Sequence, residues 1–467
     1  MLFSSFSFLF WFLPTTLLLY FLPTALLPAG RMRLAFQNGV LLTSSLIFYA
    51  WGEPIYVLLM VGVILADTLL GLLLARTHHP RAVLTLAIIL HVGLLFYYKY
   101  AAFFAEALGL YLSAPRLPLG ISFYTFQALS YLIDVYRKEV PAEKNPAVLG
   151  VYVALFPQLI AGPIVRYGDV AAALRKRTHS VTGMADGIRR FSAGLAKKLL
   201  LANPMGELFA LLMARPLLSA TGAWTALLAF AFQIYFDFSG YSDMAIGLGR
   251  IFGFRFPENF HYPYIAHSIT DFWRRWHITL SAFFKAYVYI PLGGNRRGVF
   301  RTVVNLFAVW VLTGLWHGAA WCFLAWGVYY FLLLVAEKYL LKAVLHRLPS
   351  AVTRTGTLIA VLLGWMIFAF DGSTPQLSFS ALPPFLSALV GTNGLLLRAE
   401  WYDLVRHLPL LVLCALGSTP LPKSIYRQTV YEKRQFWLRT ALPVIALLLA
   451  VTDLSDVGFN PFLYFRF

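Results

Sequence analysis

The longest uncharged stretch of this chain limits its fold more than any other feature. No Asp, Glu, Lys or Arg occurs between Arg301 and Glu337, and His317 lies in the middle of this stretch, within LTGLWHGAAW. A run of this length and character is typical of helices in hydrocarbon. Hydrocarbon offers an imidazole no hydrogen-bonding partner, so His317 requires a polar cavity, a tunnel or a partner side chain.

The composition places the whole chain in the membrane. Of its 467 residues, 60% are hydrophobic and 12% are charged, and the mean hydropathy is +0.71. Soluble domains are about half apolar and about a quarter charged. Because the apolar runs are nearly continuous, we expect one membrane-embedded domain over residues 1–467.

Apolar segments recur along the chain and predict an all-α, polytopic fold with about a dozen membrane helices. The first, MLFSSFSFLFWFLPTTLLLYFL, has no preceding positive charge and no small-residue cleavage site, so we expect a retained span rather than a signal peptide. The segments lie near residues 6–28, 34–50, 54–76, 83–107, 119–136, 147–165, 222–250, 302–316, 318–336, 355–370, 403–417 and 438–453.

The basic residues predict the orientation in the membrane. Lys and Arg number 38 against 20 Asp and Glu, which gives a net charge of +18. In a membrane protein such an excess marks cytoplasmic loops that lie against anionic lipid headgroups, and no basic soluble domain suggests nucleic acid as a partner. Placing the dense basic loops in the cytoplasm puts both termini outside; these loops are residues 31–33, 76–81, 137–144 and 423–439.

Two stretches differ from simple membrane spans. Residues 166–200 are basic and only partly apolar, which predicts helices on the cytoplasmic surface. Residues 255–298 are rich in aromatic residues, His, Arg and Gly, which predicts irregular or re-entrant structure enclosed by protein. The chain shows no internal repeat of the kind found in many secondary transporters, which counts against a carrier.

Two acidic residues lie in an otherwise apolar predicted helix. Asp237 and Asp243 are six residues apart in YFDFSGYSD, and carboxylates at membrane depth are candidates for a functional site. The alternative is that each is only a structural partner of Arg250, Arg274 or Arg275, since buried ions need partners in any case. The sequence leaves both interpretations open.

The segment DFWRRWHITLS concentrates charged and aromatic side chains. On a continuous helix Trp273 and His277 would share one face, and Asp271 would lie next to Arg275. These neighbours favour a polar tunnel wall that includes Arg274, Arg275 and His277. The alternative for His277 is a structural histidine at a helix contact.

His317 has glycine neighbours on both sides. Gly314 and Gly318 permit close approach of another backbone or of a bound molecule. A neutral imidazole, with an ordinary pKa near ~6.5, could act as a general base. The alternative is a packing histidine that donates a hydrogen bond to a backbone carbonyl.

Other kinds of site are weakly supported. His261, His267 and His277 are spaced by six and ten residues, which matches no zinc motif, so no metal is expected. Cys322 and Cys414 provide no disulfide framework. The sequence also contains no GxSxG, Walker A or dinucleotide-binding motif.

The loop IPLGGNRRG combines adjacent glycines with Arg296 and Arg297. Backbone N–H groups and positive charge of this kind can bind a phosphate. The alternative is a basic cytoplasmic turn that touches lipid headgroups.

Several motifs together resemble the membrane-bound O-acyltransferase family and, within it, the alginate O-acetyltransferase branch of bacterial envelope enzymes. The resemblance extends from the first span to the last residues. The motifs are LPLGISFYTFQALSYLIDVYR, FPQLIAGPIVRY, YFDFSGYSDMAIGLGRIFGFRFPENFHYPY, SITDFWRRWHITLS, YIPLGGNRRG and LTGLWHGAAW.

The resemblance implies a multi-span enzyme with a tunnel through the membrane. His317, in the LWHG motif, would be the catalytic base. His277, in the RWH motif, would be the second histidine of the same site and would position the acyl carbonyl together with Arg274 and Arg275. The remaining candidates for lining the tunnel or positioning the substrate are Asp237, Asp243, Trp273 and Trp316.

The resemblance also implies partners and a location. An acyl group, expected to be acetyl, would pass from a cytoplasmic thioester donor, acetyl-CoA or an acyl-carrier thioester, to an extracytoplasmic SGNH-type acyltransferase partner. That partner would esterify a polysaccharide or related envelope polymer, and no bound cofactor is expected. The implied location is the bacterial inner membrane, and candidates for contacting the donor phosphate are Lys285, Arg296 and Arg297.

The C-terminal sequence NPFLYFRF is similar to endings in this branch and in small partner peptides of the teichoic-acid D-alanylation system. In those proteins a tyrosine is proposed to carry the acyl group, and the matching residue here is Tyr464. The alternative is an interfacial aromatic anchor. The chain departs from the family at Lys285-Ala286, where a basic–acidic pair is frequent, and this puts a local salt bridge in doubt.

Three functions are therefore compared: an acyltransferase, a proton-coupled transporter with a His and Asp relay, and a non-catalytic scaffold of a polysaccharide-modifying complex. The joint presence of His277 and His317 in the recognised motifs favours the enzyme. The acceptor is left open among alginate, cellulose, peptidoglycan and teichoic acid.

Overall fold

A computed structural model describes residues 1–28, 30–345, 347–432, 435, 437–456 and 462–463. These residues form helices and connecting turns, and none of them lies in a β-strand. The chain divides into two compact units. Unit 1 comprises residues 1–195, 241–258 and 454–461, and unit 2 comprises residues 196–240, 259–453 and 462–467.

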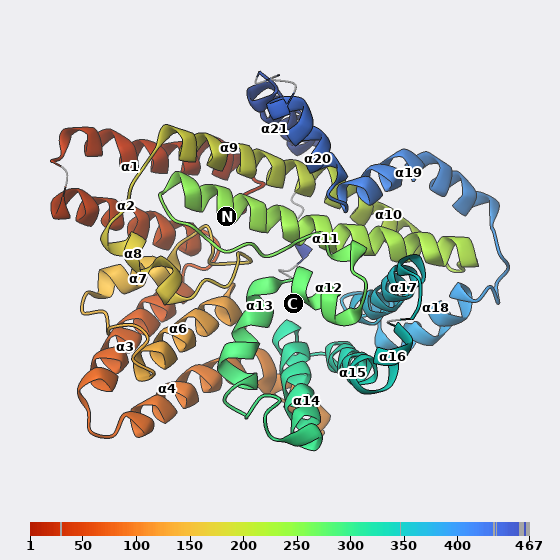
Figure 1. The fold of residues 1–467 in the computed structure, drawn as a ribbon, viewed down its shortest axis with the longest axis horizontal. Helices are drawn as coiled ribbons and strands as arrows, with labels where there is room; N and C mark the ends of the chain where they lie inside the picture. Colours follow the sequence, from red (N-terminus) through yellow and green to blue (C-terminus); the bar gives the residue numbers. More distant parts are fainter. Residues whose placement is uncertain (29, 346, 433–434, 436, 457–461, 464–467) are drawn as a thin grey trace. The chain divides into compact units, whose positions relative to one another are not determined.

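Unit 1 is built around a buried helix, α6 (Ile121–Tyr136), which packs against α3 and α4 (Figure 1). A buried polar pair joins these two neighbours, since His91 Nε2 of α4 lies 3.0 Å from Asp67 Oδ1 of α3. The other helices of this unit are η1 (Phe8–Phe12), α1 (Leu13–Leu26), α2 (Arg31–Ala50), α3 (Tyr56–Arg76), α4 (Pro80–Leu95), η2 (Phe96–Tyr100), α5 (Ala101–Ala107), α7 (Pro146–Ala154), α8 (Tyr167–Arg175) and α9 (Val181–Ala196).

The long helix α11 (Ala220–Ile251) contributes its first part to unit 2 and its remainder to unit 1. The other helices that lie mostly or wholly in unit 2 are η3 (Lys197–Ala202), α10 (Asn203–Met213), η4 (Pro263–Ile265), α12 (Ile269–Arg275), α13 (Ile278–Phe284), η5 (Lys285–Tyr289), α14 (Gly298–His317), α15 (Trp321–Ala336), η6 (Glu337–Leu341), α16 (Lys342–Leu345), α17 (Ser350–Ala369), η7 (Pro375–Leu377), η8 (Phe379–Ala381), α18 (Leu382–Leu389), α19 (Arg398–Gly417), α20 (Leu421–Arg427), η9 (Gln428–Glu432) and α21 (Leu438–Asp456).

Helices α14 and α15 form a tight hairpin in unit 2. A Cβ built on Gly314 would lie 2.3 Å from the carbonyl oxygen of Phe323, and one on Gly327 would lie 2.4 Å from that of Trp310. Only glycine permits this approach of two helix backbones. Gly314 was expected to permit close approach of a backbone or of a bound molecule, and the group that approaches is the backbone of α15.

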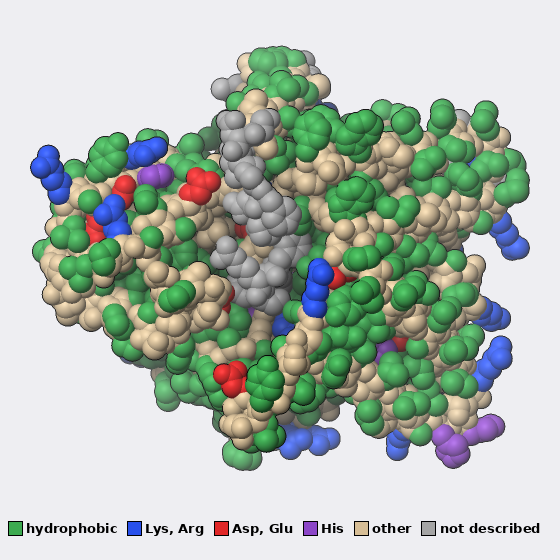
Figure 2. Space-filling view, turned by 180° about the vertical axis from the view of Figure 1, so that it is seen from behind, with side chains coloured by type: hydrophobic (Ala, Val, Ile, Leu, Met, Phe, Trp, Pro, Cys, Tyr) green, Lys and Arg blue, Asp and Glu red, His purple; other side chains and the backbone are tan. Residues whose placement is uncertain are grey.

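Several helices suit a membrane. By length and composition, four stretches of the described residues could cross it: Tyr56–Arg76, Pro80–Ala107, Gly298–His317 and Ser350–Ala369. A fifth is possible if the bent pair Arg398–Gly417 and Leu421–Val430 counts as one span. Hydrophobic side chains cover much of the face seen in Figure 2, with charged residues scattered between them. The chain is a multi-pass membrane protein, although the described helices do not establish a dozen spans.

The two unusual stretches have the expected character. Residues 166–200 contain α8, α9 and the start of η3, so the predicted helices are present, and their location on the cytoplasmic surface stays a prediction. Residues 255–298 are broken into η4, α12, α13 and η5, as predicted for irregular structure. His277 lies in this second stretch and belongs to unit 2.

Candidate active site

His277 lies at a break between two short helices. Helix α12 ends at Arg275, α13 begins at Ile278, and the backbone of His277 is left-handed, with φ +44°. The prediction that Trp273 and His277 share one face of a continuous helix is therefore wrong. A long-range hydrogen bond replaces a helical one at this break, because Ile278 N–H donates to the Asn259 carbonyl over 3.0 Å.

The Asn259 side chain fixes the tautomer of His277. Asn259 Oδ1 accepts from the backbone N–H of Thr279 (3.3 Å) and from its hydroxyl (2.9 Å), and it lies 3.1 Å from His277 Nδ1. A backbone N–H only donates, so this Asn atom is the oxygen. The proton of neutral His277 is consequently on Nδ1, and Nε2 carries the lone pair.

Burial keeps His277 uncharged. The residue is 1% exposed and lies outside the candidate membrane spans, and burial lowers its pKa to about 3. The Phe238 ring of α11 meets the imidazole edge-on at a centroid distance of 4.7 Å. A neutral imidazole with its lone pair at Nε2 can accept a proton or a hydrogen bond.

Trp316 connects the two histidines singled out from the sequence. Its ring centroid lies 5.7 Å from that of His277 and 5.0 Å from that of His317, which is the last residue of α14. His317 is buried, and it packs edge-on against Trp326 at 5.0 Å and Phe368 at 5.1 Å. The structure thus brings both imidazoles onto one indole.

Trp273 belongs to the aromatic cluster next to His317. Its centroid lies 4.7 Å from that of Trp310, 4.9 Å from that of Tyr330 and 5.6 Å from that of Trp326. Trp326 in turn contacts His317. Trp273 therefore packs in the aromatic cluster whose member Trp326 contacts the candidate base.

The two carboxylates of YFDFSGYSD have different partners and belong to different units. Asp237 Oδ1, in unit 2, lies 2.6 Å from Lys198 Nζ. Asp243, in unit 1, pairs with Arg190 at 2.6 Å, and Arg190 also contacts Glu258. Each carboxylate therefore has a cationic partner, as the structural alternative requires, but the partners are Lys198 of η3 and Arg190 of α9 rather than the expected Arg250, Arg274 or Arg275.

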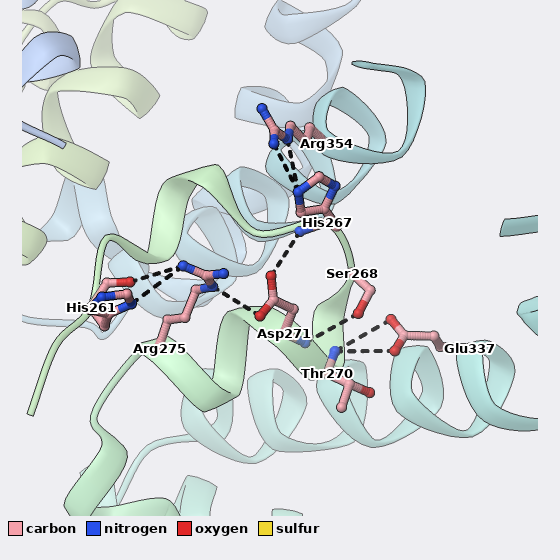
Figure 3. Close-up of polar contacts among 8 residues, drawn as sticks. All are labelled: His261, His267, Ser268, Thr270, Asp271, Arg275, Glu337 and Arg354. Carbon is pink, nitrogen blue, oxygen red and sulfur yellow. Dashed lines mark hydrogen bonds and ion pairs between the residues drawn. The ribbon is translucent and has the colours of Figure 1, made fainter. Parts of the chain in front are cut away.

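The arginines of α12 lie on its outer side. Arg274 is exposed, and Arg275 donates through Nε to Asp271 Oδ1 over 2.9 Å, which confirms the predicted contact one turn apart (Figure 3). Arg275 also donates to the carbonyl of His261 over 3.4 Å. Arg275 thereby ties α12 to the preceding loop.

The start of α12 is fixed by two side chains. Ser268 Oγ accepts from Asp271 N–H over 3.1 Å, and the Glu337 carboxylate accepts from the backbone N–H groups of Ile269 (2.7 Å) and Thr270 (3.2 Å). Figure 3 shows the Ser268–Asp271 and Glu337–Thr270 contacts beside the Arg354–His267 contact. Acceptors at a helix N-terminus satisfy otherwise unpaired donors, so α12 is a rigid support for the break at His277.

The basic residues proposed for donor binding lie on the surface. Lys285, Arg296 and Arg297 are exposed. The turn that carries the two arginines is held by Asn305, whose Nδ2 donates to the Gly294 carbonyl over 2.9 Å. Their contact with a phosphate stays a prediction. Among the described residues, no group of three or more His, Cys, Asp or Glu side chains is placed to hold a metal ion.

The comparisons with known proteins decide the family. The model of the membrane-bound O-acyltransferase family matches residues 144–380. A Pseudomonas aeruginosa protein named "Probable alginate O-acetylase" is 42% identical, over 79% of this chain and 72% of its own length. The chain belongs to the membrane-bound O-acyltransferase family.

Other relatives in this acyltransferase family carry different substrate names. A Helicobacter pylori peptidoglycan O-acetyltransferase is 32% identical over 100% of this chain and 98% of its own length. A Bacillus subtilis teichoic acid D-alanyltransferase is 27% identical over 54% of this chain and 67% of its own length. The family makes this chain an acyltransferase, and the similarity to the alginate O-acetylase branch is confirmed.

The structure also identifies residues that the sequence did not single out. Asn259 stands in the quoted motif PENFHYPY, and Lys198 is a charged residue in the apolar run LAKKLLLA. The sequence signals for these two positions were an amide side chain within a recognised motif and a lysine within an apolar run. Tyr464 lies outside the described residues, whereas its neighbour Leu463 is described and buried.

Proposed function

We propose that this enzyme moves an acyl group, acetyl in the first instance, from a cytoplasmic thioester to the exterior for O-acylation of an envelope or secreted polysaccharide. The relatives are named for alginate, peptidoglycan and teichoic acid, and acylation of an envelope polymer is common to these names. The observation that carries the proposal is the pair of buried imidazoles, His277 and His317, in contact with one indole.

The chemistry follows from the two imidazoles. His317 accepts the proton of the acceptor hydroxyl while the hydroxyl oxygen attacks the thioester carbonyl. The new C–O bond forms, the C–S bond breaks, and the leaving thiolate takes the proton back from His317 to give a thiol. The net result is one ester and one thiol, with no change of oxidation state.

The role of His277 differs from the expectation drawn from the sequence. With its proton on Nδ1, bound to Asn259, neutral His277 offers only a lone pair at Nε2. A lone pair cannot polarise an acyl carbonyl, which needs a donor. We therefore assign His277 to a positioning role, in which its Nε2 accepts a hydrogen bond from a second donor group of the bound acceptor, because the single proton of the reacting hydroxyl goes to His317.

The partners follow from the same proposal. Acetyl-CoA or an acyl-carrier thioester supplies the acyl group on the cytoplasmic side, where Lys285, Arg296 and Arg297 would attract its phosphates. A tunnel between the two faces and an SGNH-type partner on the exterior complete the transfer. The bacterial inner membrane is the location that suits this arrangement.

The test is acetyl transfer by membranes that contain the His317→Ala variant. With labelled acetyl-CoA as donor and the native polymer and partner present, polymer-bound acetyl should fall by about 100-fold or more, as expected for loss of a general base. His79→Ala, at an exposed histidine of unit 1, is the matched control and should keep full activity.

The two other functions predict different results. A scaffold whose histidines only pack would acylate the polymer normally after His317→Ala. A transporter would show ion-coupled flux in liposomes without any thioester donor. Either result would remove the catalytic assignment of His317.

A further inference from the structure

The buried pair Lys198–Asp237 holds more than two helices together. Lys198 is 3% exposed and Asp237 is 2% exposed. Asp237 Oδ1 faces Lys198 Nζ at 2.6 Å, whereas its Oδ2 accepts the backbone N–H of Leu463 over 2.6 Å. One carboxylate therefore binds both a side chain of η3 and the backbone of the C-terminal segment, 226 residues away in sequence.

The lysine makes a second contact with the same segment. Lys198 Nζ lies 4.7 Å from the ring centroid of Phe462, a cation–π distance. Phe462 is 1% exposed and Leu463 is 7% exposed. Both members of the ion pair thus contact the C-terminal segment, which is here defined as Phe462 and Leu463. A pair that only joined η3 to α11 would require neither contact.

The docked segment forms part of a cavity wall. Leu463 lines a cavity of about 270 Å³ in unit 2, together with residues of α10, α11 and the end of α17. The apolar part of the wall includes Phe209, Phe230 and Leu377, and the polar part includes Gln233 and Asp371. Removing Leu463 from its place would therefore open the cavity along one side.

Two consecutive residues of α17 link the cavity wall to the candidate base. Ala369, at the end of α17, lines the cavity. The preceding residue, Phe368, meets the His317 imidazole edge-on at 5.1 Å. A change in the wall can reach His317 through two consecutive residues of one helix.

We propose that Lys198 and Asp237 form a docking site for the chain's own C-terminal segment, and that the docked segment is required for acyl transfer. The charged pair holds the segment through a backbone N–H and an aromatic ring, and Leu463 then completes the wall beside α17. Charge-assisted hydrogen bonds of this kind are among the stronger polar contacts in a protein. Only the effect on acylation rests on the proposed function; the docking stands on the contacts of Phe462 and Leu463.

The experiment measures docking without using activity. In full-length protein with Cys322→Ala and Cys414→Ala, the substitutions Leu463→Cys and Met213→Cys place two thiols in the same cavity wall. A short bis-maleimide should join them, and mass spectrometry gives the yield of the cross-linked peptide. Phe300→Cys with Leu463→Cys is the negative pair, since Phe300 is 83% exposed and outside the cavity wall.

The docking site is then removed without leaving a buried charge. The double variant Lys198→Met with Asp237→Leu replaces the ion pair by apolar side chains, a change that buried pairs often tolerate. Cross-link yield should fall by about tenfold, because a charged hydrogen bond to the segment is lost. Polymer acetylation, measured without the cysteines, should fall with it.

A second ion pair in unit 2, with a buried aspartate and a partly exposed arginine, supplies the control. Arg215 and Asp403 form an ion pair in which Asp403 is 6% exposed. Arg215→Met with Asp403→Leu should retain both the cross-link and acetylation. Equal losses in the two double variants would show general destabilisation and would overturn the docking site.

The remaining outcomes are also decisive. A cross-link that persists after Lys198→Met with Asp237→Leu overturns the docking, and full acetylation despite a lost cross-link overturns the requirement for it. His317→Ala should form the cross-link normally. If the parent chain forms the cross-link but acetylates no polymer, the proposed function fails while the docking stands.

Discussion

The Nδ1 atom of His277 lies 3.1 Å from Oδ1 of Asn259, and this contact determines which nitrogen of the imidazole can accept a proton. Asn259 is 1% exposed, and its backbone carbonyl accepts a hydrogen bond from the N–H of Ile278, the residue after His277. A left-handed histidine, at φ +44°, is uncommon outside such a constrained setting. Asn259 is therefore a positioning residue for the candidate active site.

Asn259→Asp tests this relationship through the pH profile of acyl transfer. The carboxylate can accept the same hydrogen bonds, but its negative charge stabilises the imidazolium and raises the pKa of His277 by about 1–3 units. The site needs neutral His277, so activity should appear only at higher pH. The acid limb of the kcat/KM profile should move upward by a comparable amount, and an unmoved limb would contradict the positioning role. Thr279→Val, which removes only one donor to Asn259, should leave the limb in place.

Gly314→Ala should destabilise the α14–α15 hairpin. The added Cβ would lie 2.3 Å from the Phe323 carbonyl oxygen, so the two backbones must separate, at a cost of about 1–3 kcal/mol. Thermal unfolding in detergent gives the change. Gly356→Ala is the control, because a Cβ there meets nothing within 4 Å; alanine in that helix should be stabilising by about 0.5–1 kcal/mol. Equal Tm values for the two variants would show that the contact is not tight in solution.

Glu143 should make unit 1 sensitive to acid. Burial alone would raise its pKa, but hydrogen bonds from the Asn145 N–H, the Tyr167 hydroxyl and Arg175 outweigh burial and lower it. A lowered folded-state pKa means that the stabilisation is complete above the ordinary Glu pKa of 4.5 and is lost as pH falls through the folded value.

Tm measured against pH tests the contribution of Glu143. Glu143→Gln should cost about 1–3 kcal/mol at neutral pH, and it should flatten the fall of Tm below the ordinary Glu pKa. Glu139→Gln, at a 55% exposed side chain on the same loop, should change stability by less than ~0.5 kcal/mol. The prediction fails if both variants titrate as the parent does.

Arg296 and Arg297 should act on donor binding alone. Both are exposed on the turn before α14, so Arg296→Gln with Arg297→Gln should raise KM for the thioester by about threefold to tenfold and leave kcat unchanged. The effect should shrink as ionic strength rises. Arg347→Gln, at another exposed arginine of unit 2, is the control. A fall in kcat with constant KM would exclude the phosphate contact.

Local pattern was sufficient where one element determines the outcome. The thirty-five uncharged residues after Arg301 form the apolar helices α14 and α15, as their composition predicts. Asp271 contacts Arg275 because the two residues are one helical turn apart. The glycine at 314 correctly indicated a close approach, and the structure shows that the approaching group is a backbone. The pattern failed at His277, because the bonds from Asn259 that end the helix come from a loop eighteen residues earlier.

The sequence by itself determined the membrane location, the helical class and the family, since apolar runs, charge and sequence motifs are properties of the chain. Only the tertiary structure decided which side chains meet. It paired Asp237 with Lys198 and with the backbone of Leu463, and it brought His277 against Trp316, the chain neighbour of His317. Such contacts depend on how helices pack across long separations, where no local periodicity carries information.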